Sequence, residues 1–272
     1  MDNRAIGVLD SGLGGLTAVR ELRRLLPEED LLFFGDTGRV PYGSRSPKVI
    51  REYAGECLRF LEKQEVKMVV VACGTISSVF GDELSTLLSV PCMGVLEATV
   101  NAAVAATKNN KIGLIATEAT VSSRSYEKLT KERLPKAEFT AKACPLFVPL
   151  VENGYFGTHC EVARSVAKDY LSAFDGKDVD TLILGCTHYP LLYHLIDDLT
   201  DYRLNLIDAG KETAVAAKDY LAENDLLAKR EQGSIKAFVT DTAESFARLG
   251  REFLGEELSD VTRLSIEELS KE

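Results

Sequence analysis

Two cysteines stand at the ends of two apolar runs of the sequence, and a threonine follows each of them closely. The first run is MVVVACGT at residues 68–75, and the second is LILGCTH at residues 182–188. Such short apolar runs are typical of strands buried in a parallel sheet. If the two strands face each other across a cleft, one thiol stands on each side of a small substrate. Such a pair could remove a proton from one face of a carbon and return a proton to the other.

The positions of Cys73 and Cys186 favour reactive thiols. We expect a helix to begin just after each cysteine, and a helix N-terminus favours the thiolate form. His188 lies two residues after Cys186 and could exchange a proton with that thiol or with a substrate amine. A buried cysteine is more often an inert core residue, and that alternative stays open for each one alone. A matched pair at matched positions favours chemistry.

Two carboxylates are further candidates. Asp10 opens the run DSGLGG at residues 10–15, whose glycines and free backbone N–H groups could hold an anion at a helix start. The run is neither a dinucleotide-binding nor a P-loop motif, so a substrate carboxylate site and a structural turn both remain open, as does a helix cap for Asp10. Glu152 could approach His188 in the fold, although an exposed carboxylate at a helix start is the ordinary interpretation.

A loop after the second predicted strand could line a polar pocket. It contains GDT at residues 35–37 and PYGS at residues 41–44. Its hydroxyls and backbone N–H groups could contact a ligand, and a plain turn is the alternative. The chain has no serine hydrolase elbow and no His-Glu-x-x-His metal motif, and no lysine has the context of a pyridoxal phosphate site.

Apolar runs alternate with helix-period stretches along the whole chain, which predicts an α/β fold with mainly parallel sheets. One helix should begin at Pro47 behind a Ser46 cap and bury Cys57. The run around Ile112 resembles the run around Ile6, and the number of residues between them is nearly the same as that between Cys73 and Cys186. This near-equal spacing suggests two similar halves with a crevice between them. Strands are expected at residues 5–9, 31–34, 67–72, 92–95, 111–116, 138–143, 181–184, 204–207 and 235–240.

Composition narrows the class of protein. The chain has 272 residues, enough for one large domain or two modest ones, and a formal net charge of -10. That charge argues against a nucleic-acid partner. Six cysteines without metal-like spacing favour free thiols in a reducing compartment. No run is long and apolar enough for a leader or a membrane span, so we expect a soluble cytoplasmic protein with no membrane partner.

Four motifs together resemble the signatures of the cofactor-independent glutamate racemases. They are IGVLDSG (6–12), GDT with PYG (35–37 and 41–43), VACGT (71–75) and GCTHYPL (185–191), and the resemblance runs from near residue 5 to about residue 250. It implies two similar α/β domains, each a mainly parallel sheet flanked by helices, with the active site in the cleft between them. Residues 1–97 plus 208–272 would form the first domain, and residues 98–207 the second.

The same resemblance implies roles for individual residues. Cys73 would act on D-glutamate and Cys186 on L-glutamate, with Asp10 assisting the first thiol and His188, backed by Glu152, assisting the second. It also implies a homodimer that needs no cofactor or metal and that supplies D-glutamate for peptidoglycan in a bacterial cytoplasm. Substrate-binding positions would be Asp10, Ser11, Pro41, Tyr42, Gly43, Gly74, Thr75, Thr117, Thr120 and Thr187.

The chain departs from the family pattern at one position. Gly74 stands where the family usually has Asn, so a side-chain donor and acceptor is missing, and we expect a small void that water could fill. Losing one positioned contact can cost on the order of 10² in rate, so altered activity or selectivity is our hypothesis. A racemase for another acid, such as aspartate, remains an alternative. A non-catalytic binding or regulatory relative is a further one.

Overall fold

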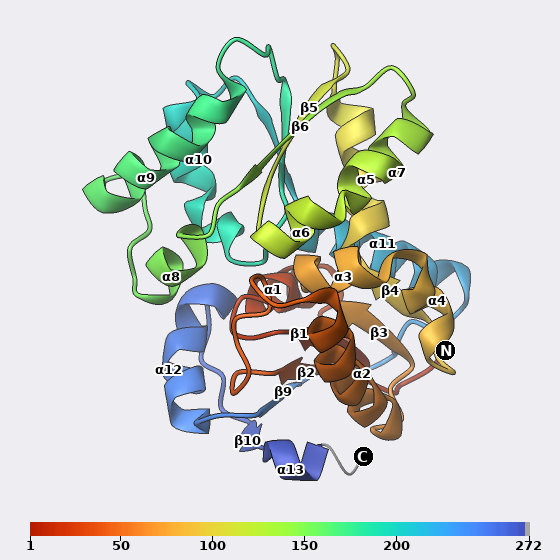
Figure 1. Ribbon diagram of the computed structural model, residues 1–272. Coiled ribbons are helices and arrows are strands. Elements are labelled where there is room, and N and C mark those ends of the chain that lie inside the picture. Colours follow the sequence, from red (N-terminus) through yellow and green to blue (C-terminus); the bar gives the residue numbers. More distant parts are fainter. Residues whose placement is uncertain (270–272) are drawn as a thin grey trace.

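The computed structural model describes residues 1–269 and contains two parallel sheets, one in each half of the molecule (Figure 1). The larger sheet has the order β10-β9-β2-β1-β3-β4 and the smaller one β6-β5-β7-β8. The strands are β1 (Ile6–Asp10), β2 (Leu31–Gly35), β3 (Met68–Val71), β4 (Cys92–Gly94), β5 (Lys111–Ala116), β6 (Glu138–Ala143), β7 (Thr181–Leu184), β8 (Asn205–Asp208), β9 (Ile235–Val239) and β10 (Val261–Arg263).

The two sheets repeat one arrangement. The order β2-β1-β3-β4 in the larger sheet matches β6-β5-β7-β8 in the smaller one, and every strand pair is parallel. Strands β1 and β5, and likewise β3 and β7, therefore hold equivalent places. The prediction of an α/β fold with two similar halves is confirmed. The proposed domain boundaries stay a prediction; the strands of each sheet lie within them except at Asp208, the last residue of β8.

All nine expected strands form, with ends that differ by at most one residue from the expected ones. Strand β10, a three-residue strand paired with β9 at the edge of the larger sheet, was not predicted from the sequence. Its residues are half-buried or exposed and carry no apolar run, so the hydrophobic pattern contained no signal for it.

Helices connect the strands and cover the sheets (Figure 1). Helix α2 begins at Pro47, the Ser46 hydroxyl accepts a hydrogen bond from the Val49 N–H, and Cys57 is buried, all as expected. The helices are α1 (Leu16–Leu25), α2 (Pro47–Lys63), α3 (Gly74–Phe80), α4 (Leu84–Leu87), α5 (Val95–Ala106), α6 (Glu118–Ser123), α7 (Ser125–Arg133), α8 (Phe147–Glu152), α9 (Glu161–Leu171), α10 (Tyr193–Leu199), α11 (Ala209–Glu223), α12 (Ala243–Leu254) and α13 (Ile266–Leu269), with 3-10 turns η1 (Gly81–Glu83), η2 (Ser172–Phe174) and η3 (Tyr189–Leu192). Over residues 1–269, no helix has the length and apolar character needed to cross a bilayer.

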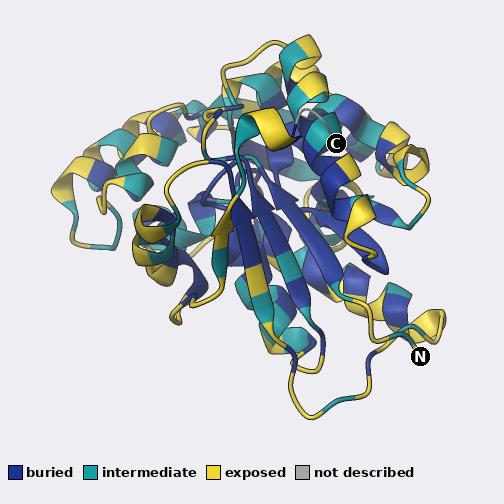
Figure 2. Ribbon diagram, turned by 90° about the horizontal axis from the view of Figure 1, so that it is seen from below, coloured by how far each residue is buried: buried dark blue, intermediate teal, exposed yellow. Residues whose placement is uncertain are grey.

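Strand β1 shows how the core forms. All five of its residues are buried, and the larger sheet is dark along its centre in Figure 2. Ile6 and Val8 belong to the apolar cluster that contains the buried face of α1, whereas Leu9 joins the cluster of α2 on the other face. Successive residues of a strand point to opposite faces, so a sheet covered by helices on both sides needs an unbroken apolar run.

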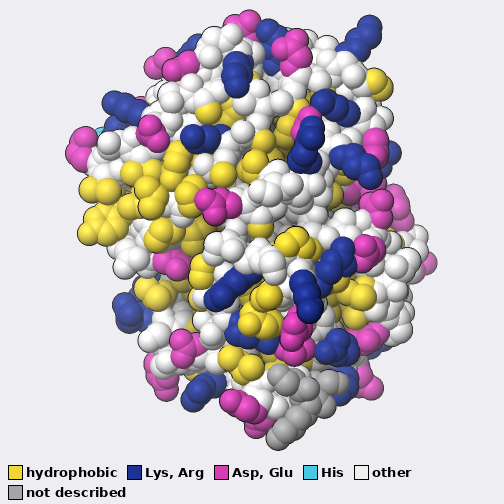
Figure 3. All heavy atoms as spheres, in the orientation of Figure 1, with side chains coloured by type: hydrophobic (Ala, Val, Ile, Leu, Met, Phe, Trp, Pro, Cys, Tyr) yellow, Lys and Arg dark blue, Asp and Glu magenta, His cyan; other side chains and the backbone are white. Residues whose placement is uncertain are grey.

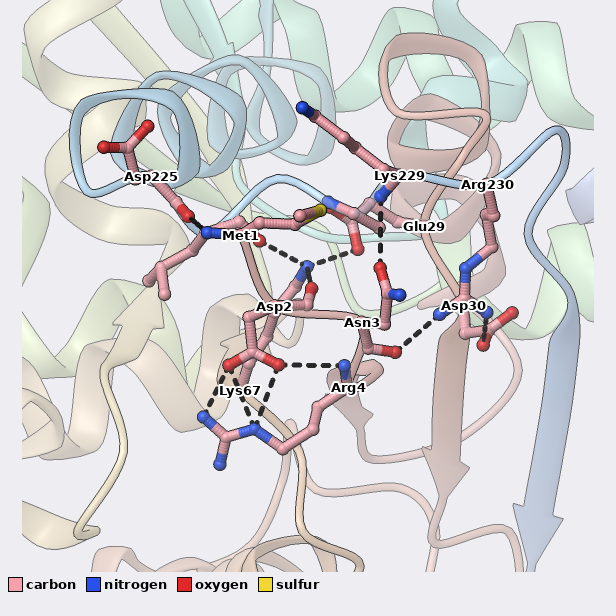
Figure 4. Close-up of polar contacts among 12 residues, drawn as sticks. Met1, Asp2, Asn3, Arg4, Glu29, Asp30, Lys67, Asp225, Lys229 and Arg230 are labelled. Carbon is pink, nitrogen blue, oxygen red and sulfur yellow. Dashed lines mark hydrogen bonds and ion pairs between the residues drawn. The ribbon is translucent and has the colours of Figure 1, made fainter.

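A buried ion pair ties the amino ends of the strands together (Figure 4). Lys67, just before β3, pairs with Glu29, just before β2, and both side chains are almost completely buried. The ammonium also donates to the Asp2 and Leu226 carbonyls, each at 2.8 Å. Glu29 accepts a further hydrogen bond from the Ala228 N–H at 2.8 Å. The pair thereby joins the N-terminal segment to the chain that follows α11.

The surface carries both signs of charge. Lys, Arg, Asp and Glu side chains are interspersed over the face shown in Figure 3, and hydrophobic side chains gather over α8 and α9. Leu146, Tyr155 and Val162 are exposed large apolar residues of this region.

Candidate active site

A cavity of about 450 Å³ lies where the carboxyl ends of the two sheets meet. Residues after β1 and β3 line one side, and residues after β5 and β7 line the other, as expected for a ligand site beyond parallel strands. Twelve of the predicted site residues line it: Ser11, Pro41, Tyr42, Gly43, Cys73, Gly74, Thr75, Thr117, Glu152, Cys186, Thr187 and His188. Asp10 and Thr120 are not among the lining residues, and both are buried.

Cys73 is a buried thiol at the start of α3. Its Sγ donates to the Ser11 hydroxyl at 3.5 Å, and the residue is only 4% exposed. Burial, with a smaller contribution from the Asp10 carboxylate, raises the pKa of Cys73 to about 12. The Ile76 N–H in the first turn of α3 lowers this pKa, as expected of a helix N-terminus, but burial outweighs it, so the expectation of a favoured thiolate is wrong. Helix α3 has only seven residues, and its dipole does not offset the loss of solvation.

Asp10 lies behind the cavity wall, completely buried. Its Oδ2 accepts from the Gly12 N–H at 3.0 Å, and the Thr187 hydroxyl donates to Oδ1 at 3.5 Å. Burial raises the pKa of the Asp10 carboxyl. Helix α1 begins at Leu16 and its N-cap is Gly15, so the alternative of Asp10 as the N-cap residue is wrong. The carboxylate instead holds the turn after β1 against the turn that follows Cys186.

On the opposite side, Cys186 is the first member of a chain of three polar side chains. Its Sγ lies 3.8 Å from His188 Nδ1, and His188 Nε2 lies 2.8 Å from Glu152 Oε1. Burial lowers the pKa of His188, but the contacts with Cys186 and Glu152 outweigh it and raise that pKa to about 10. The imidazole therefore carries a proton over the physiological range of pH.

Two expectations about this side need correction. No α-helix begins right after Cys186, because a turn leads into the 3-10 turn η3 at Tyr189, and α10 begins only at Tyr193. A helix N-terminus therefore does not act on this thiol as was expected. Glu152 ends α8 rather than starting a helix, so it is no exposed helix-start carboxylate. Its side chain is 35% exposed and points to the histidine.

Three threonine hydroxyls connect the two halves across the cavity. Thr75 Oγ1 lies 2.9 Å from Thr117 Oγ1, which donates to Thr120 Oγ1 at 3.0 Å. Thr117 also caps α6, because its hydroxyl accepts from the Thr120 N–H at 3.3 Å. Thr75 lies in the first turn of α3, which follows β3, and Thr117 is the N-cap of α6, which follows β5, so the contact joins the two halves of the molecule.

The loop with Pro41, Tyr42 and Gly43 is held from behind by Asp36. The Tyr42 hydroxyl donates to Asp36, which also accepts from Arg39 Nε at 2.7 Å and from the Thr240 hydroxyl at 2.8 Å. Burial raises the pKa of Tyr42. Tyr42 lines the cavity, and its hydroxyl is engaged by Asp36. The expected loop after β2 is thus part of the pocket wall and not a plain turn.

Gly74 lines the cavity, but the space that a side chain at this position would enter is already filled. A Cβ on Gly74 would come within 3.0 Å of the Gly185 carbonyl oxygen, a distance that real Cβ atoms essentially never show. The expected water-sized gap is therefore absent, because the backbone before Cys186 occupies the space. Sequence reasoning missed this contact, since nothing in either motif reports how closely the two turns approach.

One wall of the cavity was not predicted from the sequence. Cys144, Pro145, Val148 and Pro149 line it from the end of β6 and the start of α8. Their only sequence signal was position, since they follow a predicted strand whose carboxyl end faces the same cleft. This wall supplies apolar surface beside the two thiols, and the hydroxyls supply polar contacts. The arrangement can bind a small polar molecule and transfer protons on two sides of it.

The sequence and the fold of this chain are similar to those of known racemases. The model of the Asp/Glu/Hydantoin racemase family matches residues 6–217. A glutamate racemase of Geobacter metallireducens is 43% identical over 265 residues, which are 97% of each chain. The crystal structure of glutamate racemase from Francisella tularensis in complex with D-glutamate superposes with a TM-score of 0.92 at 37% identity, covering 100% of both chains. That of the Thermus thermophilus enzyme in complex with beta-chloro-D-alanine has a TM-score of 0.89 at 43% identity, covering 98% of this chain and 100% of the other.

Proposed function

The chain belongs to the Asp/Glu/Hydantoin racemase family, and from this premise we propose that it is a glutamate racemase that inverts the α-carbon by two cysteines. The observation that carries the proposal is the placement of Cys73 and Cys186. They follow equivalent strands of two similar halves and line one cavity from its two sides. A substrate bound between them presents opposite faces of one carbon to the two thiols.

The proposed reaction needs one thiol and one thiolate at a time. The raised pKa of Cys73 keeps it protonated, so it serves as the acid when Cys186 removes the α-proton of L-glutamate. Cys186 then carries the proton taken from substrate, and Cys73 is left as the thiolate. D-Glutamate enters this second form of the enzyme, and the same steps run in reverse. The protonated His188 beside Cys186 stabilises negative charge on that sulfur.

An α-proton of an amino acid is a very weak acid, so the site must stabilise the developing carbanion. We propose that Ser11, Thr75, Thr117 and Thr187 hold the substrate carboxylates and amino group together with backbone N–H groups of the Pro41–Gly43 loop and of residue 74. Fixed donors in a cavity that excludes water stabilise such charge more strongly than solvent does. Asp10 and Thr120 act from behind by holding Thr187 and Thr117.

Incubation of the enzyme with L- or D-glutamate in deuterated water tests the proposal. We expect the wild type to racemise both enantiomers and to place deuterium at the α-carbon of the product, followed by circular dichroism and proton NMR. Cys73→Ser and Cys186→Ser should each lower kcat/KM by at least about 10²-fold. Cys160→Ser, a half-buried cysteine next to α9 that does not line the cavity, is the matched control.

Two outcomes contradict the proposal. Full activity in either cavity variant excludes the two-cysteine mechanism, and conversion of aspartate in preference to glutamate reassigns the substrate. We further propose a cytoplasmic homodimer that supplies D-glutamate for peptidoglycan. Light scattering of the purified protein tests the dimer, and rescue of a bacterium that requires external D-glutamate tests the pathway.

A further inference from the structure

The residue after one cysteine touches the residue before the other. Gly74 follows Cys73, Gly185 precedes Cys186, and a Cβ at position 74 would overlap the Gly185 carbonyl oxygen. The backbone at Gly185 is held in place, because its N–H donates to the Ile115 carbonyl at 2.9 Å and it directly follows the paired strand β7. The two cysteine turns are therefore packed backbone against backbone.

The contact belongs to a seam of close contacts between the halves. Thr17 Oγ1 donates to the Thr187 carbonyl at 2.9 Å, and the Thr75 and Thr117 hydroxyls meet at 2.9 Å. A Cβ on Gly14 would likewise come within 3.0 Å of Thr187 Oγ1 and His188 Nδ1. The turn after β7 is thus held from two sides, and any added atom at the seam must push the halves apart.

We propose that Gly74 is a positioning residue that sets the separation of Cys73 and Cys186, an inference that rests on the proposed racemase function. The absent side chain at position 74 lets the turn of Cys186 come closer to the turn of Cys73 than any other residue type would allow. In this chain, position 74 therefore serves the reaction through its size and not through a polar group.

The separation of Cys73 and Cys186 matters more for inversion of the α-carbon than for the first proton transfer. Removing the α-proton needs one thiolate in contact with the substrate, whereas inversion also needs the opposite thiol within reach of the carbanion. A displacement of about 1 Å can cost about 10²-fold in rate. If the seam widens, the carbanion is reprotonated more often from the side on which it formed. Where the thiol on that side has first exchanged the abstracted proton with deuterated water, it returns deuterium, and the substrate exchanges its α-proton without inversion.

The test measures exchange and inversion in the same experiment. Gly74→Ala and Gly74→Asn are incubated with D- or L-glutamate in deuterated water, and deuterium in the unconverted enantiomer is compared with formation of the product enantiomer. We expect kcat/KM for racemisation to fall between about 10-fold and 10²-fold. The ratio of exchange to racemisation should rise. Gly55→Ala in α2 is the matched control, since its Cβ would meet only the Arg59 guanidinium at 3.5 Å.

Crystal structures of the wild type and of Gly74→Ala supply a readout that does not depend on activity. We expect a larger distance between the sulfurs of Cys73 and Cys186 in the variant. An unchanged distance, or a racemisation rate within twofold of wild type with an unchanged exchange ratio, overturns the inference. If the wild type fails to racemise glutamate, the proposed function fails. The sulfur-to-sulfur distances in the two crystal structures then test by themselves whether Gly74 sets the separation of the cysteines. Should Gly74→Ala not fold, Gly14→Ala must produce the same rise in ratio and in distance.

Discussion

Cys73 and Cys186 occupy equivalent places but have different neighbours. Cys73 lies close to the buried Asp10, and burial together with that carboxylate favours the neutral thiol, although the Ser11 hydroxyl acts in the opposite sense. Cys186 is close to His188, whose proton is held by Glu152. Different charged neighbours therefore act on the two sulfurs, and a substitution can change the neighbours of one sulfur without changing those of the other.

Substitution of Glu152 by Gln should lower the pKa of His188. The carboxylate is one of the contacts that raise it, and an amide removes that attraction while keeping the side-chain length. We expect the ring signals of His188 in proton NMR to titrate at a lower pH than in the wild type, and kcat/KM to fall about 10-fold. Glu161→Gln, at the exposed start of α9, should change neither. An unaltered His188 titration would remove Glu152 from this role.

The raised pKa of His188 also predicts how stability depends on pH. A basic group whose pKa is higher in the folded than in the unfolded protein stabilises the fold fully below its unfolded value of 6.5, and loses that contribution as pH rises through about 10. We expect the free energy of unfolding of the wild type to fall between pH 6.5 and 10 by more than that of His188→Gln. Urea titrations at both pH values measure this difference. Parallel curves for the two proteins would contradict it.

At the scale of elements, turns after parallel strands carry the site, and most of them were visible in the sequence. The apolar runs ending on Asp10, Cys73 and Cys186 located three strand ends, and parallel pairing brings such ends to one edge. The wall from Cys144 to Pro149 was missed because its residues are apolar and resemble core. The state of Cys73 was predicted wrongly because the depth of burial, and the neighbouring Asp10, depend on the packing of the two halves.

The loop at Pro41–Gly43 is held by the hydrogen bond from the Tyr42 hydroxyl to Asp36, which lies just before the loop in the chain. Removing the Tyr42 hydroxyl with Tyr42→Phe deprives the buried Asp36 of one donor, which should cost about 2 kcal/mol in unfolding free energy. We also expect KM to rise more than kcat falls, because the loop positions substrate and not the thiols. Chemical denaturation and steady-state kinetics test this. Tyr53→Phe keeps its ring on the Arg39 guanidinium, 4.3 Å from its centroid, and should match the wild type.

At the scale of the whole molecule, the buried Lys67–Glu29 pair fastens the end of the larger sheet away from the cavity (Figure 4). Lys67→Met leaves an uncompensated carboxylate in the interior and should destabilise the protein by about 3–5 kcal/mol. Adding Glu29→Gln should recover part of that loss. Because the pair lies at the amino ends of the strands, kcat of the folded variant should equal that of the wild type. A large drop in kcat without loss of stability would refute this separation.

Cys73 and Cys186 have different surroundings, but these cannot make racemisation more efficient in one direction than in the other. Enantiomers have equal free energy in water, so the equilibrium constant of racemisation is unity, and kcat/KM must be the same in both directions. Glu152→Gln, which touches only one side of the cleft, must therefore lower kcat/KM for L- and D-glutamate by the same factor. The kcat and KM values can still respond differently in the two directions, because the same loss of kcat/KM can come from a lower kcat or from a higher KM. A fold built from two matched halves thus needs no matched chemistry, since thermodynamics balances the two faces whatever residues line them.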